Sequence, residues 1–372
     1  MKLTCQRDGL LTASQICSVA VAPRNVNPIL SNIKAIAQDD ALVLMATDLE
    51  VGVRYELRGV KVQRAGSAIL PVQKLISILR ENPDEEVTLD SDDEGTTMRT
   101  RAGRFQLPGG IPDEFPDVPT FDMTGRYHEI RAGMLKTLLK RTAFAAEKKE
   151  NARFNVNGIL WEAEGKIARL VSTDTKRLAY AEGDADIHGP DEAKVHSHLI
   201  PLKTITLLER SLTDDGEIIR ISLKPNAAIF QTERALIHSG LGSGKFPPYR
   251  DIIPKKHAVK LSLPPAEFLA RVKQAAIMTD DESKRVDFHF EPGKVSLTAR
   301  GAETGSSEVS MELPEYAGPE IKIAFDPNFI IDMFRAIDGE PNVTLEMTDG
   351  MKPAVFRVGE TYLYLVMPMG GK

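Results

Sequence analysis

Residues 68–79, with the sequence AILPVQKLISIL, join a short apolar strand to an amphipathic helix and decide the fold class. The apolar step ends at Pro71, and Leu75, Ile76 and Leu79 then follow helical spacing. A second strand follows at Glu86–Leu89. Two later stretches repeat this order of strand, helix and strand: 198–221 and 323–345.

A second kind of strand–helix unit alternates with the first. Alternating apolar segments between the helices predict further strands, at 41–46, 167–171 and 294–298. Three repeats, each with two helices against antiparallel strands, predict an α+β fold, although any three α+β domains would share much of this pattern. The second kind of unit is predicted at Leu3–Cys5 before a helix from about Asp8, at Glu129–Ile130 before Met134–Phe144, and at Leu261–Leu263 before Pro264–Ile277.

Two polar breaks separate the three repeats. They lie at Phe121–Arg126 and Ile253–His257, and neither is a long flexible linker. We therefore expect three similar domains, at residues 1–126, 127–254 and 255–372.

Composition narrows the class of protein. Cys5 and Cys17 are too few for a disulfide framework, and Met1–Thr4 lacks the apolar segment of a signal peptide, so we expect a cytoplasmic protein with no membrane contact. The net charge of −6 argues weakly against nucleic-acid binding, but it does not show where the basic residues lie.

Motifs for catalysis or for a cofactor are poorly matched. The segment Gly240–Lys245 resembles a phosphate loop but has Ser239 and Phe246 where that loop needs a glycine and a hydroxyl. His196 and His198 would share one face of a strand, but nothing nearby completes a metal site. The acidic cluster at 90–94 reads as a hairpin turn. We expect no enzyme, no metal and no cofactor.

Short motifs recur along nearly the whole chain, at 28–32, Thr47–Glu50, 157–160, Ser172–Ala179, Phe246–Arg250 and Tyr364–Met369. A single such motif is weak, but several in the same order on a threefold repeat are together specific. They resemble the β subunit of bacterial DNA polymerase III, the sliding clamp family.

The resemblance implies a homodimer closed head to tail into a ring. Six domains would surround duplex DNA, with helices lining the hole and sheets outside. The ring would tether the replicative DNA polymerase subunit, be placed on DNA by a clamp loader complex, and serve other clamp-binding polymerases and repair proteins. No reaction is catalysed in such a ring.

The DNA path should then be basic, because phosphate contacts without base readout permit sliding. The predicted helices supply Lys74, Arg80, Lys136, Lys140, Arg141, Lys203, Arg210, Arg271, Lys273 and Arg335, all of which would also fit ordinary solvated helix faces. The resemblance favours Arg24, Lys74, Lys148, Lys149 and Lys203 as DNA contacts.

The resemblance also implies an apolar groove for partner peptides, with Met and Pro as an adaptable floor. Core packing of a C-terminal strand remains an alternative for Leu365. Thr175, Lys176 and Asp251 depart from the family pattern at the rim, which bears on peptide preference. The implied residues are Val156, Thr173, Thr175, Lys176, Arg177, Leu178, Pro247, Ile252, Pro353, Leu365, Met367, Pro368 and Met369.

For the contact between ring subunits, the matching positions are Phe105 and Leu107 in the first domain and Ile277 in the third. Arg104 and Glu303 would add charge pairs of small energy. Two alternatives remain: a similar ring or scaffold for another DNA transaction such as repair, and an enzyme whose site is scattered over the repeat.

Overall fold

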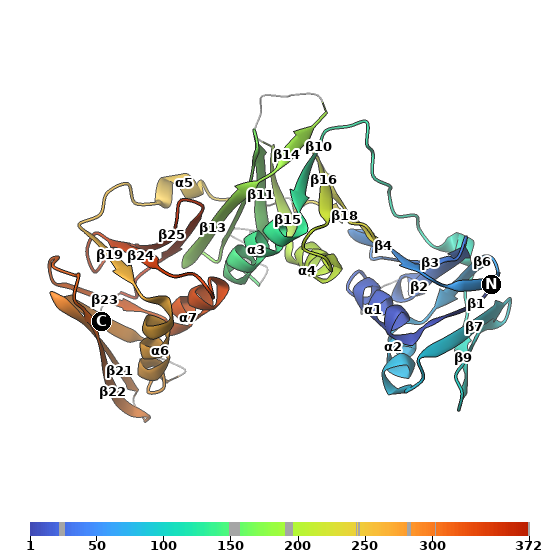
Figure 1. Ribbon diagram of the computed structural model, residues 1–372, viewed down its shortest axis with the longest axis horizontal. Helices are drawn as coiled ribbons and strands as arrows, with labels where there is room; N and C mark the ends of the chain where they lie inside the picture. Colours follow the sequence, from blue (N-terminus) through green and yellow to red (C-terminus); the bar gives the residue numbers. More distant parts are fainter. Residues whose placement is uncertain are drawn as a thin grey trace. The chain divides into compact units, whose positions relative to one another are not determined.

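The computed structural model describes residues 1–21, 27–148, 157–189, 196–242, 244, 246–280, 284–301 and 303–370. These residues form helices and antiparallel sheets in two compact units (Figure 1). The first unit contains Met1–Lys136, Ala163–Lys166 and Asp184–Gly242. The second contains Thr137–Glu162, Ile167–Gly183 and Ser243–Lys372.

The first unit is built on two antiparallel sheets. The smaller has the order β5 (Lys61–Arg64), β1 (Lys2–Gln6), β7 (Glu86–Asp92), β8 (Gly95–Arg99) and β9 (Arg104–Pro108). The larger has the order β14 (Asp186–His188), β10 (Tyr127–Arg131), β16 (Ile218–Lys224), β17 (Ala227–Gln231), β18 (Ala235–Gly240), β4 (Val51–Arg58), β3 (Ala41–Thr47), β2 (Ile33–Gln38) and β6 (Gly66–Leu70).

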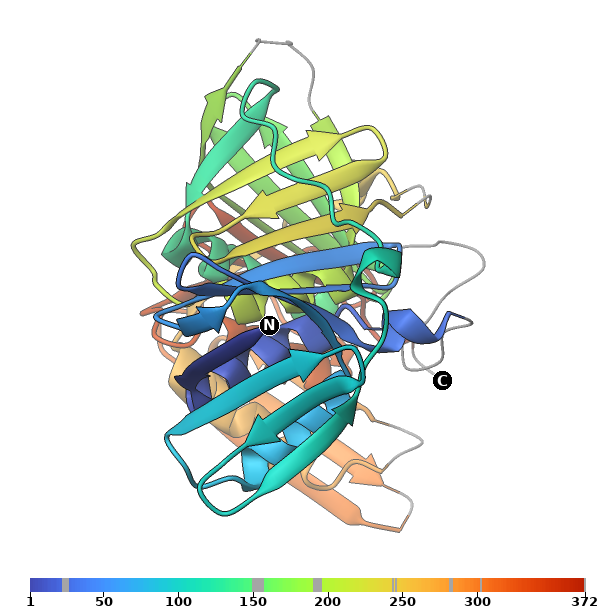
Figure 2. The ribbon, with the colours of Figure 1, turned by 90° about the vertical axis from the view of Figure 1, so that its right-hand side faces the viewer.

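Helices pack against these sheets. Helices α1 and α2 lie side by side, and Figure 2 shows α2 behind the strands of the smaller sheet. The helical elements are α1 (Arg7–Ser18), α2 (Val72–Glu81), α4 (Leu202–Ser211), which follows β15 (His196–Pro201), and the 3₁₀ turns η1 (Pro28–Ser31) and η2 (Pro112–Glu114). Helix α3 (Ala132–Thr142) has residues in both units.

The second unit also has two sheets. In one, the strands that this unit contributes follow the order β11 (Gly158–Glu164), β12 (Ile167–Thr173), β13 (Arg177–Asp184), β26 (Tyr362–Val366), β25 (Ala354–Val358), β24 (Val343–Met347) and β19 (Val259–Leu263). The other runs β22 (Gly305–Leu313), β21 (Gly293–Gly301), β20 (Val286–Glu291) and β23 (Ile321–Phe325). Its remaining elements are η3 (Ala143–Ala145), α5 (Tyr249–Ile252), α6 (Pro265–Ala276) and α7 (Pro327–Ala336).

The six long helices predicted from apolar spacing are confirmed. In α2, the predicted residues Leu75, Ile76 and Leu79 are buried, while the opposite face is polar. Helix α7 begins at Pro327, and the Asp326 side chain accepts a hydrogen bond from the Asn328 backbone N–H. Local chemistry and burial therefore favour the same boundaries.

Hydrogen-bond pairing confirms that the repeat extends to the strands. Strand β1 pairs with β7, β10 with β16, and β19 with β24, each time antiparallel. Strands β4 and β18 pair in the first unit in the way that β13 and β26 pair in the second.

The C-terminal strand β26 covers only the first part of the apolar segment Tyr364–Met369. It ends at Val366, and Met367–Met369 continue without strand pairing. Pro368 has no backbone N–H to donate to a neighbouring strand, so the strand ends before the apolar run does.

Candidate functional site

The turn at residues 173–177, called here the Thr173 turn, is held by its own polar side chains. Thr173 Oγ1 donates to the Arg177 carbonyl (2.6 Å) and accepts from the Thr175 N–H (3.1 Å). Asp174 Oδ1 accepts from the backbone N–H groups of Lys176 and Arg177, at 3.0 Å each. The turn holds Thr175 at φ 73° and leaves Thr175 and Lys176 exposed.

The guanidinium of Arg177 supports this turn from inside. Nε donates to Asp174 (2.9 Å), Nη1 to Asp332 on α7 (2.9 Å), and Nη2 to the Phe144 carbonyl (2.9 Å). The group also stacks on the Phe329 ring, 4.6 Å from its centroid. Since every guanidinium nitrogen has a partner within the chain, Arg177 fixes the turn relative to α7.

The segment Met367–Gly370, called here the C-terminal tail, lies beside the turn. The Met367 N–H donates to the Lys176 carbonyl and the Met369 N–H to the Ala324 carbonyl, both at 2.8 Å. Met367 is 42% exposed, and Pro368 and Met369 are half-buried. The tail therefore presents apolar side chains at the surface although its backbone is anchored.

A buried apolar cluster lies next to the turn and tail. Leu178 and Leu365 face each other across β13 and β26 and pack in this cluster. Pro247 is half-buried, Ile252 is 48% exposed on α5, and Pro353 is half-buried before β25. The cluster contains Leu160, Val171, Leu178, Tyr249, Val355, Leu363 and Leu365, with Tyr180, Phe246 and Ile253 packed at its edge.

A charged group that the sequence reading missed anchors α5. Glu162 on β11 is nearly buried and accepts hydrogen bonds from Tyr249 Oη (2.9 Å) and Arg250 Nη2 (2.7 Å). Burial, and after it the negative charge of Glu162, raises the pKa of Tyr249. The phenol therefore stays protonated and donates a hydrogen bond to Glu162. A single acidic residue inside the apolar run 158–163 is the signal that would have found it.

Eleven of the predicted groove residues therefore lie on or beside the Thr173 turn, the C-terminal tail, the apolar cluster and α5, and Pro353 lies at the start of β25. Val156 lies outside the described residues. The arrangement is a buried apolar cluster bordered by the exposed side chains of Met367, Lys176 and Ile252, which is chemistry that suits an extended peptide with apolar side chains.

The predicted DNA contacts differ in their surroundings. Lys74 on α2 is exposed and has no carboxylate partner among the described residues, whereas Lys203 on α4 forms an ion pair with Asp48. Lys148 is exposed, and Arg24 and Lys149 lie outside the described part of the chain. Exposed helix cations without an ion pair among the described residues are Lys74, Arg80, Lys140, Arg210, Lys273 and Arg335.

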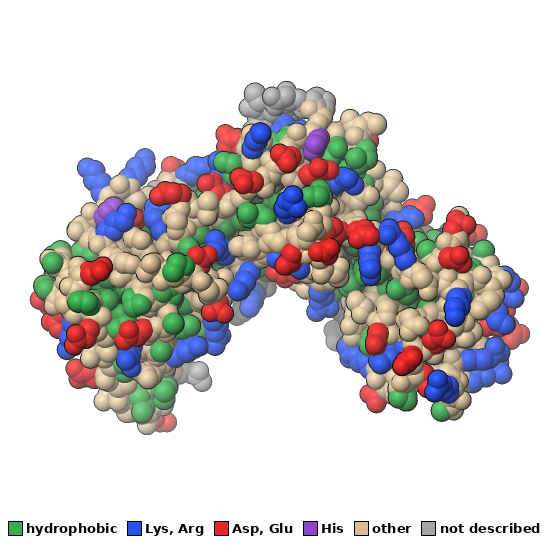
Figure 3. Space-filling view, viewed as in Figure 1, with side chains coloured by type: hydrophobic (Ala, Val, Ile, Leu, Met, Phe, Trp, Pro, Cys, Tyr) green, Lys and Arg blue, Asp and Glu red, His purple; other side chains and the backbone are tan. Residues whose placement is uncertain are grey.

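Other basic side chains on the helices are neutralised locally. Lys136 pairs with Asp215, Arg141 with Glu340, and Arg271 with Glu267 (3.5 Å). Figure 3 shows Lys and Arg side chains at the surface near α2, and again near α6 and α7. Lys74 and Arg80 on α2, Lys273 on α6 and Arg335 on α7 therefore carry positive charge with no ion pair among the described residues.

The residues predicted for the subunit contact lie on two sheet edges and one helix end. Strand β9 ends the five-stranded sheet, with Arg104 and Phe105 exposed and Leu107 buried. Strand β22 ends the four-stranded sheet and is mostly exposed, and Glu303 precedes it. Ile277, at the end of α6, is 70% exposed. Leu107 therefore packs into its own sheet and leaves Phe105 as the outward apolar residue of β9.

Within the described residues, no cluster of three or more His, Cys, Asp and Glu side chains is arranged to hold a metal ion. The same part of the chain has no helix of the length and apolarity needed to cross a membrane. Gly240 ends β18, and Ser243 and Lys245 of the glycine-rich segment lie outside the described residues.

Comparison with known proteins matches the whole length of the chain. Three family models match in order: the N-terminal domain of the DNA polymerase III beta subunit at residues 1–119, its central domain at 129–248 and its C-terminal domain at 250–370. The beta sliding clamp of Caulobacter vibrioides is 30% identical, over 99% of this chain and 100% of the relative.

Solved structures share the fold. A sliding clamp from Bacillus subtilis has a TM-score of 0.90 at 24% identity, covering 100% of both chains. A sliding clamp from Pseudomonas aeruginosa bound to griselimycin has a TM-score of 0.89 at 26% identity, also covering 100% of both chains. The α+β fold predicted from the repeat and the clamp fold implied by the resemblance are thereby confirmed.

Proposed function

The chain belongs to the family of the DNA polymerase III beta subunit, the sliding clamps, and from this membership we propose that two copies close head to tail into a ring around duplex DNA. Each copy would contribute three clamp domains, at 1–126, 127–254 and 255–372. The ring would tether the replicative polymerase to its template by topology. We propose no catalysed reaction and no cofactor, and a cytoplasmic location.

The observation that best supports the ring is a pair of sheet edges that have no neighbouring strand among the described residues. Strand β9 lies near the start of the chain and β22 near its end, and each is the last strand of its sheet among the described residues. Joining β9 of one copy to β22 of the next makes a heterologous contact, which closes with two copies and leaves no such edge open. Phe105 and Ile277 supply exposed apolar surface for it, and Arg104 and Glu303 supply charges at its rim.

Within the ring, the free helix cations would contact phosphates without reading bases. Lys74 and Lys148 are exposed for this role, and Arg24 and Lys149 are proposed for it from the family pattern alone. Lys203 would exchange Asp48 for a phosphate when DNA is present. Such contacts are individually weak and salt-dependent, which permits sliding.

The Thr173 turn, the C-terminal tail and the apolar cluster would form the docking groove. Pro247, Ile252, Met367, Pro368 and Met369 would supply apolar surface for Leu and Phe side chains of a partner peptide, over the buried Leu178 and Leu365. Arg177 would act by positioning the turn, since its guanidinium is occupied by internal partners. The replicative polymerase, the clamp loader and other clamp-binding polymerases and repair proteins would share this groove.

A processivity assay tests the proposal. Primed circular DNA, a replicative polymerase and a clamp loader should yield long products only when the intact chain is added, and its native mass should be near twice 41.0 kDa. A matched variant, Phe105→Asp with Ile277→Asp, should be monomeric and inactive. A monomeric native chain, or full processivity from this variant, would overturn the ring.

A further inference from the structure

The first strand of each repeat is β1, β10 or β19, and two of these three strands are paired on both edges. Strand β1 lies between β7 and β5, and β10 lies between β16 and β14. Strand β19 pairs with β24 and is the last strand of its sheet among the described residues. A pairing position that is filled in two repeats is therefore open in the third.

The registers of β1 and β10 show which side chains lie opposite the first strand where this position is filled. Leu3 of β1 is opposite Leu89 on one side and Val62 of β5 on the other. His128 of β10 is likewise opposite Ile187 of β14. In β19, Leu261 is opposite Leu345 in the way that Leu3 is opposite Leu89. An added strand should thus place an apolar side chain opposite Leu261.

Local sequence explains why the chain does not fill this position itself. Strand β5 follows β4 in the first repeat, but the corresponding segment after β22 is 314–320, PEYAGPE. Pro314 and Pro319 have no N–H to donate to a ladder. The Tyr316 N–H donates to the Leu313 carbonyl (2.9 Å), and its carbonyl accepts from Gly293 (2.8 Å), so the backbone is used in a turn instead.

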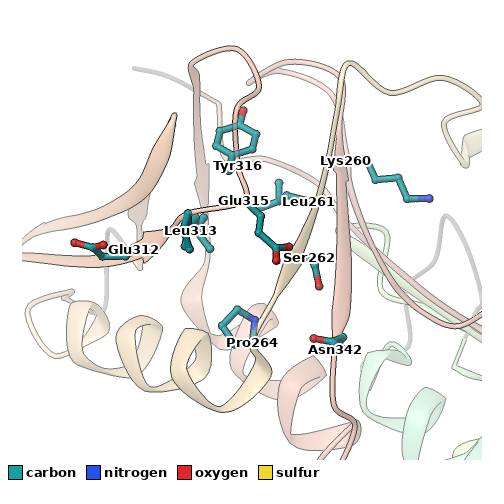
Figure 4. Close-up of a pocket in the computed structure, with 10 residues that line it drawn as sticks. Lys260, Leu261, Ser262, Pro264, Glu312, Leu313, Glu315, Tyr316 and Asn342 are labelled. Atoms are coloured by element: carbon teal, nitrogen blue, oxygen red, sulfur yellow. The ribbon is translucent and has the colours of Figure 1, made fainter.

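A pocket of 360 Å³ lies between this turn and β19 (Figure 4). Leu261, Leu313 and Tyr316 are buried and form its apolar part. The exposed side chains of Glu312 and Glu315 line it too and form no ion pair among the described residues. Figure 4 shows Glu315 turned toward Ser262 on β19. Lys260 also lines the pocket, and its ammonium group pairs with Glu346 at 3.8 Å.

We propose that the open edge of β19 is a docking site for an extended segment of a partner protein, which adds to the sheet as an antiparallel strand. Backbone N–H and C=O groups of the edge would supply the hydrogen bonds. The segment would be apolar where it faces Leu261 and basic where it passes Glu312 and Glu315. Strand β5, with the sequence Lys-Val-Gln-Arg, has this composition in the first repeat. The site is separate from the groove at the Thr173 turn.

The test uses the full chain and a capped peptide, GVKVQRAG, that copies residues 59–66. We expect saturable binding and slower amide hydrogen exchange at Val259–Leu263, because these amides would become covered. Two control peptides should bind at least about tenfold more weakly: one with Pro in place of the second Val, which removes a ladder donor, and one with Glu in place of Lys and Arg.

Protein variants complete the test. Glu315→Lys, which lies outside β22 and therefore outside the proposed ring contact, should weaken the basic peptide severalfold and leave folding intact, because its side chain is exposed. Glu360→Lys, an exposed charge reversal in the turn before β26, is the control and should bind as the parent does. Absent binding, equal binding of the acidic peptide, or protection at β1, β9 or β22 in place of β19 would each overturn the proposal. A chain that forms no ring, or that binds no peptide in the groove, could still bind this peptide at β19. The test therefore distinguishes failure of this proposal from failure of the proposed function.

Discussion

The turn at residues 47–51 in the first unit, the Thr47 turn, and the Thr173 turn in the second have the same hydrogen-bond pattern. Thr47 Oγ1 donates to the Val51 carbonyl (3.0 Å), and Asp48 Oδ1 accepts from the Val51 N–H (2.7 Å), as Thr173 and Asp174 do with Arg177. The neighbouring strand repeats too: the Gly240 N–H donates to the Glu50 carbonyl (2.7 Å), as Met367 does to Lys176.

The side chains around the two turns differ. Gly52 follows the Thr47 turn, and a Cβ there would lie 3.1 Å from the Val118 methyl groups, so Val118 fills that space. Leu178 occupies the matching position after the Thr173 turn and packs with Tyr249. Gly240 stands where the second unit has Met367. The two turns therefore share a backbone but not the apolar side chains around it, and the proposed groove depends on those few side chains.

The charged contacts of the two turns differ as well. Asp48 pairs with Lys203, which is a third exposed, whereas Asp174 pairs with Arg177, whose side chain is 9% exposed and also holds Asp332. The first turn has a partly exposed pair, whose cation would be released to a phosphate under the proposed function. The second has a buried network that fixes its geometry.

The largest expected effect is a difference in the free energy of unfolding between variants of these two charged networks. Arg177→Ala should lower the free energy of unfolding by about 2–3 kcal/mol, less than for a fully buried pair because Asp332 regains water. Lys203→Ala should cost under about 1 kcal/mol. Urea denaturation of both variants measures the difference, and equal costs would show that the Arg177 network is no stronger than a surface pair.

Removing Met367–Lys372 tests the exposed surface of the second turn. We expect affinity for a polymerase-derived peptide to fall at least about a hundredfold, roughly 2.7 kcal/mol, because Met367, Pro368 and Met369 are lost from the rim. The native mass should remain that of the ring, since β9 and β22 are unchanged. Calorimetric titration and native mass measure the two outcomes, and retained affinity would refute the groove assignment.

The sequence predicted the elements of both turns better than it predicted their surroundings. Apolar spacing located α2, α4 and α7, and family motifs pointed to Thr173–Leu178 and the tail. Spacing cannot show that the Arg177 guanidinium turns inward to Asp332, because that contact joins residues distant in the chain. The sequence could not predict the open edge of β19 for the same reason. Whether a strand pairs on both edges depends on a segment elsewhere in the chain, and here that segment is interrupted by Pro314.

Gly52→Leu tests whether Val118 occupies the space that Leu178 fills in the second unit. The new side chain would collide with the Val118 methyl groups, so we expect a loss of about 1–3 kcal/mol in the free energy of unfolding. Val118→Ala should recover much of that loss in the double variant. A double-mutant cycle by urea denaturation measures the coupling, and strictly additive costs would argue against shared space.

The smallest effect concerns the backbone that the two turns share. Leu49 (φ 78°) and Thr175 (φ 73°) both adopt the left-handed conformation that side chains disfavour. Thr175→Gly should raise the free energy of unfolding by about 0.5–1 kcal/mol, because a β-branched residue is strained most there and the relief exceeds the added chain entropy. Leu49→Gly should gain less, since leucine is unbranched at Cβ and its exposed side chain contributes little packing. Urea denaturation of both variants ranks them, and a destabilised Thr175→Gly chain would mean that the Thr175 side chain makes a contact worth more than the strain it carries.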